Sequence, residues 1–332
     1  MGHLYRGFFI QAELQKQFGI QTSFIVKGDE QVEHFLNTKK LDYIVIPDLA
    51  STDEEIGLLG TILPDLEPDL AFLDVLENDI SERYTTLFKN NTQLLIAITD
   101  DSLRGDINAH IVVNGNPNQN PAFYEELSGD YYVGPRYFIM DPDYARIETD
   151  RPQGGPKKIL VSLGGTDHHN LLFKVLDAID AKYQIDIITS KNTGYLKRLK
   201  DYLTQRATLQ YNCYSDVASL AGYWTQADVA ITAGGNTLFE RIATRLPGAT
   251  VCQLERQMEI AEKFQDMGVN ANIGYGPSLA AEQLSKGIED FLNDRNTHRR
   301  QYETAPEVLR GEGLELLMHS INIKMRAKRE RL

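Results

Sequence analysis

A short apolar run, two glycines and the start of a helix follow one another in VAITAGGNTLFE, residues 229–240. The run 229–232 is rich in β-branched residues, as strands are. Glycines directly after a strand let backbone N–H groups approach a phosphate, and the N-terminus of the following helix adds a partial positive charge. A second strand-like run, 159–163, leads into another glycine turn. The two junctions predict a diphosphate or nucleotide site formed by Gly164, Gly165, Thr166, Gly235, Asn236 and Thr237.

Strand-like runs and helix-like stretches alternate through the whole chain, which is typical of βα units and parallel sheets. The other strand-like runs lie at 22–26, 43–47, 70–74, 93–98, 111–113, 185–189 and 250–253. A segment rich in Pro and Gly, 149–157, has the composition of a linker. We therefore predict an α/β protein of two Rossmann-like domains, an N-terminal domain over 1–148 and a C-terminal, nucleotide-binding domain over 158–332.

The chain opens with Gly2-His3-Leu4-Tyr5-Arg6, which has the character of the turn and helix that follow the first strand of a Rossmann-like domain. Either that strand is missing from the N-terminal domain, or the sequence begins at an internal Met of a longer reading frame. We expect His3 at the carboxyl edge of the sheet, where an imidazole can take a proton from water. His3 is thus the candidate catalytic base, and the alternative is an exposed bystander.

Composition limits the classes of protein and partner. The 332 residues include 34 Lys+Arg and 47 Asp+Glu, a formal net charge of −13, which disfavours a nucleic-acid partner. The two cysteines, Cys213 and Cys252, form no C-x-x-C pair, which excludes a disulfide scaffold or a cysteine-built zinc site. No apolar run reaches the ~18 residues of a membrane span, and a signal peptide is not evident. We expect a cytoplasmic protein without cofactor, and its oligomeric state stays open.

Further polar residues extend the nucleotide prediction. Glu240 follows the second glycine loop by about one helical turn, where a carboxylate can accept hydrogen bonds from ribose hydroxyls. Gln257 follows the strand-like run 250–253, beyond the carboxyl end of a parallel strand. Neither His168-His169 nor Asp141-Pro142-Asp143 has a convincing metal-ligand pattern, so no metal site is predicted.

These motifs together resemble the UDP-sugar hydrolases of pseudaminic acid biosynthesis and the related spore-coat polysaccharide proteins, which are relatives of the GT-B-fold glycosyltransferases. The resemblance covers most of the chain, and Gly134-Pro135-Arg136-Tyr137 is a particularly specific match. The other matching residues are Gly2-His3-Leu4-Tyr5-Arg6, Asp74, Ile98-Thr99-Asp100-Asp101, Arg104, Val113-Asn114, Pro142, Ser162 to Asp167, Asn170, Gly235 to Glu240, Pro247 and Gln257.

The resemblance implies a GT-B-type arrangement and metal-independent, inverting hydrolysis of a nucleotide-activated diacetamido-trideoxyhexose at C1. It implies that His3 positions or activates the water and that the glycine loops hold the diphosphate of a UDP-linked sugar, with Glu240 on the ribose. Substrate contacts are implied for Arg6, Asp74, Asn114, Arg136, Tyr137 and Gln257. Two alternatives stay open: a GT-B glycosyltransferase that passes the sugar to an acceptor, and a non-catalytic nucleotide-sugar-binding protein.

Overall fold

The computed structural model describes residues 2–49, 51–75, 82–100, 107–119, 121–124, 129–147, 155–164, 167, 169–189, 193–206, 208–215, 217 and 219–329. The chain forms two compact units, each with its own parallel sheets. Unit 1 comprises Met1–Pro142 and Glu312–Leu332, and unit 2 comprises Asp143–Gly311. None of the helices in the described ranges is both long and apolar enough to cross a membrane.

Unit 2 is built on a six-stranded parallel sheet with the order β12-β11-β10-β7-β8-β9. The strand order reverses between β7 and β10, as in doubly wound α/β folds. Its strands are β7 (Lys158–Ser162), β8 (Gln184–Thr189), β9 (Gln210–Ser215), β10 (Val229–Thr232), β11 (Gly248–Cys252) and β12 (Ala271–Tyr275). Its helices are α6 (Leu171–Ala178), α7 (Thr193–Thr204), α8 (Ala221–Gln226), α9 (Asn236–Ala243), α10 (Arg256–Asp266), α11 (Ala281–Asn293) and α12 (Arg295–Val308), with the 3₁₀ turn η3 (Pro142–Arg146) before them.

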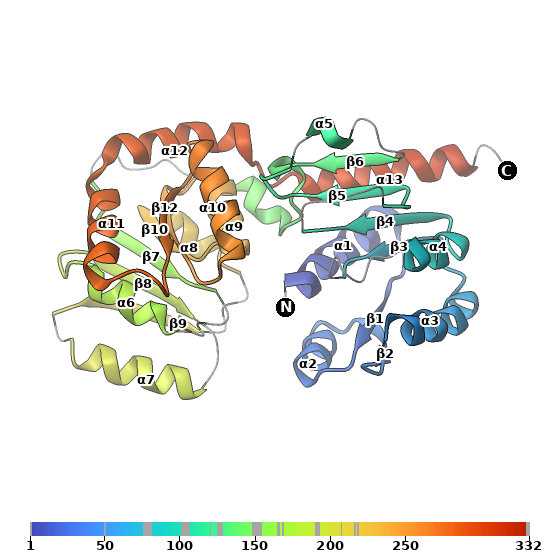
Figure 1. Cartoon of the computed structure of the whole chain (residues 1–332), viewed down its shortest axis with the longest axis horizontal. Helices are drawn as coiled ribbons and strands as arrows, with labels where there is room; N and C mark the ends of the chain where they lie inside the picture. The colour runs from blue at the N-terminus through green and yellow to red at the C-terminus, as the bar shows by residue number, and fades with distance from the viewer. Residues whose placement is uncertain are drawn as a thin grey trace. The chain divides into compact units, whose positions relative to one another are not determined.

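The core of unit 2 explains why these segments form a sheet covered by helices (Figure 1). The central strands β10 and β11 are buried along their whole length, so both faces of the sheet are covered, as continuous apolar runs require. On one face, Val161, Ile187 and Ile231 pack against Leu176 of α6 and Ile288 of α11. The rigid sheet fixes where the loops at its carboxyl edge begin.

Unit 1 contains a four-stranded parallel sheet, β3-β4-β5-β6, and a separate parallel pair, β1-β2. Its strands are β1 (Ser23–Lys27), β2 (Asp42–Ile46), β3 (Leu70–Leu73), β4 (Leu94–Ile98), β5 (Ile111–Asn114) and β6 (Asp130–Val133). Its helices are α1 (Gly2–Phe18), α2 (Glu30–Lys39), α3 (Thr52–Leu66), α4 (Glu82–Asn90), α5 (Pro121–Tyr124) and α13 (Gly313–Arg329), with the 3₁₀ turn η2 (Pro135–Tyr137). In the doubly wound order a first strand would lie between β1 and β3, and it is not among the described residues.

The last helix, α13, lies in unit 1 although the sequence places it after the second domain (Figure 1). Leu314, Leu317 and Ile321 of α13 join Ile10 of α1 and Ile96 of β4 in one buried cluster. The sequence prediction ended the N-terminal domain at 148 and assigned 158–332 to the second. The structure instead groups residues 312–332 with unit 1, because the apolar face of α13 completes the core of that unit.

Candidate functional site

The two glycine loops leave neighbouring strands at the same edge of the sheet of unit 2. Strands β7 and β10 pair in register, with Ser162 opposite Thr232, and the Ala233 N–H donates to the Ser162 carbonyl oxygen at 3.3 Å. This is the point where the strand order reverses, the place at which open α/β sheets bind ligands. The sheet thus brings the ends of both strands that carry the predicted nucleotide loops together.

The loop after β7 has an acidic side chain at its helix start. The carboxylate of Asp167 accepts hydrogen bonds from the N–H groups of Leu171 and Leu172, at 2.8 and 3.0 Å, and from the Tyr195 hydroxyl at 2.6 Å. Gly164 has a φ of +86°. Two N–H groups at the start of α6 therefore already have an anionic partner within the chain, which makes this helix end a poorer site for a second anion. Gly165, Thr166 and His168 lie outside the described residues.

The loop after β10 leads into a helix start that has no side-chain cap. Helix α9 begins at Asn236, and its N-cap residue, Gly235, supplies no side-chain hydrogen bond to the helix. Asn236 is exposed and Thr237 is half-buried. The N–H groups and partial positive charge of this helix start can therefore accept an anion.

Gln257 lies beside the same loop and has an anchored amide. Its Oε1 accepts hydrogen bonds from the backbone N–H of Gln253, at 2.8 Å, and of Leu254, at 3.3 Å. The nearest atom to a Cβ built on Gly235 would be the Gln257 Nε2, at 3.8 Å. With its oxygen occupied, Gln257 presents its N–H donors to the glycine loop. Glu240 is half-buried on α9, four residues after Asn236 and so on the same side of the helix.

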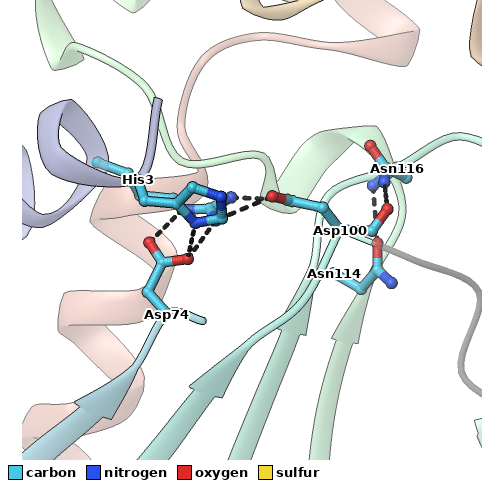
Figure 2. Close-up of polar contacts among 6 residues, drawn as sticks. His3, Asp74, Asp100, Asn114 and Asn116 are labelled. Atoms are coloured by element: carbon cyan, nitrogen blue, oxygen red, sulfur yellow. Dashed lines mark hydrogen bonds and ion pairs between the residues drawn. The ribbon is translucent and has the colours of Figure 1, made fainter. Parts of the chain in front are cut away.

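A second polar cluster lies in unit 1, at the carboxyl edge of its four-stranded sheet (Figure 2). Asp74 follows β3 directly and Asp100 follows β4 by two residues, while His3 and Arg6 share one face of α1. The His3 Nδ1 lies 2.6 Å from the Asp74 Oδ1. His3, Arg6 and Asp74, predicted from separate parts of the sequence, therefore meet in one cluster.

Arg6 connects the two carboxylates of this cluster. Its Nε and Nη2 donate to the Oδ2 and Oδ1 of Asp74 at 2.7 and 2.5 Å. Its Nη1 and Nη2 donate to the Oδ1 and Oδ2 of Asp100 at 2.7 and 3.0 Å. The Arg6 side chain is only 10% exposed, whereas that of His3 is 42% exposed. A rigid ion pair thus holds an imidazole that solvent can reach.

Electrostatic interactions within the cluster favour the ionised forms of Asp74 and Arg6. Burial alone would raise the pKa of the Asp74 carboxyl, but hydrogen bonds and charges from His3 and Arg6 outweigh it and hold that pKa below its ordinary value. Burial alone would lower the pKa of the Arg6 guanidinium, but Asp74 and Asp100 outweigh it and raise that pKa. Asp74 is therefore a carboxylate at neutral pH, able to accept the His3 N–H.

Asp100 and Asn116 belong to the same sheet edge but were not among the predicted site residues. Asn116 donates from its side-chain amide to the Asp100 backbone oxygen, and its own N–H donates to the buried Asn114 Oδ1 at 3.1 Å (Figure 2). Asp100 is among the residues that carry the resemblance, and its place just after a buried strand is the signal that could have given it a role in the site. Asn114, a predicted substrate contact, is engaged here in holding the strand ends together. The neighbouring Asp101 and Arg104, quoted for the resemblance, lie outside the described residues.

Arg136 and Tyr137 have contacts elsewhere in unit 1. The exposed Arg136 donates from Nε to the Glu312 Oε1 at 2.8 Å. The Tyr137 ring packs against the Tyr132 ring, with centroids 5.2 Å apart. The contacts of these two side chains do not join them to the His3 cluster within the described residues, and their roles toward a substrate stay predictions. The part of the chain that the structure describes contains no group of three His, Cys, Asp or Glu side chains arranged to hold a metal.

Comparison with curated proteins gives two relatives, and no family model matches the chain. The chain is 29% identical over 301 residues to the spore coat polysaccharide biosynthesis protein SpsG of Bacillus subtilis, covering 87% of this chain and 80% of SpsG. It is 25% identical over 278 residues to the uncharacterized protein MJ1062 of Methanocaldococcus jannaschii, covering 80% of this chain and 55% of that protein. The resemblance to spore-coat polysaccharide proteins that the motifs predicted is confirmed.

Solved structures confirm the fold. Acinetobacter baumannii MurG superposes with a TM-score of 0.70 at 14% identity, covering 98% of this chain and 96% of that one. The calicheamicin glycosyltransferase CalG4 gives 0.61 at 12% identity, over 97% and 94% of the two chains. An S. aureus MnaA–UDP co-structure gives 0.58 at 11% identity, over 98% and 94%. The chain therefore has the α/β fold with parallel sheets found in GT-B glycosyltransferases, as predicted.

Proposed function

We propose that this relative of SpsG hydrolyses a nucleotide-activated amino or deoxy sugar at C1, in the biosynthesis of a surface polysaccharide or a nonulosonic acid. The nucleoside diphosphate is assigned to unit 2 and the sugar and water to unit 1. The observation that carries the proposal is the solvent-accessible His3 imidazole, held at Nδ1 by the half-buried Asp74 carboxylate. A solvent-accessible imidazole in this setting is suited to activating water.

The proposed step conserves atoms and charge. The water oxygen attacks C1, the bond from C1 to the β-phosphate oxygen breaks, and its electron pair stays with the diphosphate. The proton lost by the water goes to His3. Attack from the face opposite the leaving group inverts the anomeric centre, and a diphosphate leaves without the general acid that ordinary glycosides need. The products are the free sugar and the nucleoside diphosphate.

The start of α9 and Gln257 are the groups proposed to hold the diphosphate. The helix start lacks a side-chain cap, and the Gln257 amide is anchored with its donors toward the loop. Donors fixed in advance stabilise charge that develops on a leaving group without reorganising. Of the two predicted glycine loops we therefore assign the main diphosphate contacts to Gly235, Asn236 and Thr237, with Glu240 on the ribose.

Two relatives' names support the proposed class of substrate. SpsG is named for spore coat polysaccharide biosynthesis, and the MnaA structure is a complex with UDP. Transfer of the sugar to an acceptor is the second candidate, because CalG4 is named a glycosyltransferase. The two candidates share donor, site and leaving group, so only the fate of the sugar separates them.

Isotope labelling tests the reaction directly. Purified protein is incubated in ¹⁸O-water with a UDP-linked 2,4-diacetamido-2,4,6-trideoxyhexose and no acceptor. The masses of both products are then measured by mass spectrometry. The proposal expects UDP release with ¹⁸O in the sugar and none in the phosphates. Label in the phosphate would refute attack at C1, and absence of turnover until an acceptor is added would favour the transferase. His3→Gln is expected to lower the rate about 10²–10⁴-fold, while the exposed His34→Gln of α2 serves as the matched control.

Nucleotide binding is tested separately by calorimetric titration with UDP, GDP and CMP. Absence of binding to all three would refute both catalytic candidates and the non-catalytic one. Titration with 2′-deoxy-UDP then probes Glu240: wild-type protein is expected to prefer UDP, and Glu240→Gln to lose that preference. If Glu240→Gln still prefers UDP over 2′-deoxy-UDP, the assignment of Glu240 to the ribose is refuted.

A further inference from the structure

We propose that Asp74 is a positioning residue, which fixes the proton of the neutral His3 ring on Nδ1 and so makes Nε2 the atom that accepts the proton of water. We assign Asp100 a related role, acting on the ring through Arg6. This inference rests on the proposed function for its chemistry, but the state of the ring can be measured on its own.

The geometry decides which ring nitrogen carries the proton. A distance of 2.6 Å between His3 Nδ1 and Asp74 Oδ1 requires a hydrogen between the two atoms. The carboxylate cannot supply it, because Arg6 already donates to both of its oxygens. The hydrogen therefore belongs to Nδ1, and in a neutral imidazole the lone pair is then on Nε2.

The Arg6 contact with the ring agrees with this assignment. Its Nη2 lies 3.2 Å from the His3 Nδ1, but the same Nη2 has shorter hydrogen bonds to Asp74 and Asp100, at 2.5 and 3.0 Å. A protonated Nδ1 facing Nη2 is a contact between two donors, so Arg6 does not hold the ring itself. It holds Asp74 instead, and the carboxylate holds the ring.

The Asp100 carboxylate gives the cluster a net negative charge before His3 accepts a proton. Arg6, Asp74 and Asp100 together carry a net charge of −1 beside the neutral His3 ring. After His3 accepts a proton, two cations face two carboxylates and the cluster is neutral. Asp100 does not contact the ring, but it shares Arg6 with Asp74 and leaves one negative charge uncompensated until the ring is protonated. The charges of the cluster therefore balance in the state that follows proton transfer.

This arrangement differs from an ion pair that only joins α1 to the sheet. A structural pair would be satisfied by any geometry that buries Arg6 between two acids, with the ring free to adopt either tautomer. A positioning role requires one tautomer and requires that tautomer to depend on Asp74. The nitrogen chemical shifts of the ring distinguish the two roles without any substrate.

The experiment is ¹⁵N NMR of the full-length chain with labelled histidine, at a pH where the ring is neutral. The His3 signals are assigned by their loss in His3→Gln. In wild-type protein we expect a protonated Nδ1 and an unprotonated Nε2, and in Asp74→Asn we expect the fixed tautomer to be lost. Asp53→Asn, which removes the exposed pair with Arg83 in the same unit, should leave the His3 signals unchanged. A wild-type ring protonated on Nε2, or a tautomer unchanged in Asp74→Asn, would overturn the inference.

Kinetics of the same variants give the second readout. With the nucleotide assigned to unit 2, Asp74→Asn should lower kcat by about 10²–10⁴-fold with unchanged affinity for UDP, since loss of the aspartate in serine proteases has an effect near the upper limit. Asp100→Asn should lower kcat less and also leave UDP affinity unchanged. An Asp74→Asn enzyme with wild-type kcat would overturn the inference. Wild-type protein with the expected tautomer but no hydrolysis would refute the proposed function alone.

Discussion

Replacing Gly234 by alanine tests whether the α9 loop and Gln257 hold the diphosphate. A Cβ at Gly234 would lie 2.8 Å from the Gln257 Cβ and 3.3 Å from the Cys252 Sγ. Carbon atoms in contact prefer a separation of about 3.5–4.0 Å, so the Gln257 side chain must move by roughly 0.7 Å or more at its root. The contact is with the root of the side chain and not with its flexible end, so rotation of the amide cannot relieve it.

The expected magnitude follows from the contact that is displaced. A hydrogen bond to a charged group contributes about 1.5–3 kcal/mol, and each 1.4 kcal/mol is a tenfold change in affinity. We expect Gly234→Ala to raise the Kd for UDP about 10–100-fold, measured by calorimetric titration. Overpacking should also lower the free energy of unfolding by about 1–3 kcal/mol.

Two further variants make the result decisive. A Cβ at Gly222 in α8 would meet nothing within 4 Å, so Gly222→Ala should keep the wild-type Kd. Gln257→Ala should weaken UDP binding by itself, and adding Gly234→Ala to it should cost little more, because both changes act on one contact. A folded Gly234→Ala protein with the wild-type Kd for UDP would refute the assignment of the diphosphate to this loop.

The other predictions concern stability, pH and metal. Arg6→Gln should lower the free energy of unfolding by about 3–5 kcal/mol, because it removes the buried guanidinium that neutralises the Asp74 and Asp100 carboxylates, and adding Asp74→Asn should recover part of the loss in urea titrations. The depressed pKa of Asp74 makes its contribution to stability fully present above its ordinary pKa of 3.8 and lost as pH falls through the lower folded value, so Asp74→Asn should flatten acid unfolding in that range. Burial lowers the pKa of His298 below 6.5, so stability should fall as pH drops below 6.5, and His298→Gln should reduce this fall in Tm measured against pH. Hydrolysis should survive prior dialysis against EDTA, and activity that disappears and returns with Mg²⁺ would contradict the metal-independent mechanism.

Local sequence patterns were enough to predict the layered fold. The β-branched runs 159–163 and 229–232 are each followed by glycines, and this information lies within a dozen residues of chain. The prediction of parallel sheets and of loops at one edge needed no long-range contact. His3 could also be named from its place at the start of a helix, whereas Arg6 and Asp74 were named only through the family resemblance.

Long-range contacts account for what the sequence did not predict. Asp100 contacts Arg6 from 94 positions along the chain, and the packing of α1 against β4 in the core of unit 1 brings their elements together. From the sequence, both glycine loops were predicted to bind the diphosphate equally. Their difference depends on the Asp167 carboxylate, which turns back onto α6, and on the direction of the Gln257 amide, and neither is visible in a list of residue types.

The position of α13 has a consequence for synthesis on the ribosome. Unit 2 is one continuous segment, Asp143–Gly311, so it can begin to fold while the chain is still being made. The core of unit 1 stays incomplete until Leu314, Leu317 and Ile321 have left the exit tunnel, which happens after the whole of unit 2 has been made. The unit that carries the proposed base is thus completed after unit 2, and a chain shortened before residue 312 would lose the α13 part of the unit 1 core while keeping the whole of unit 2.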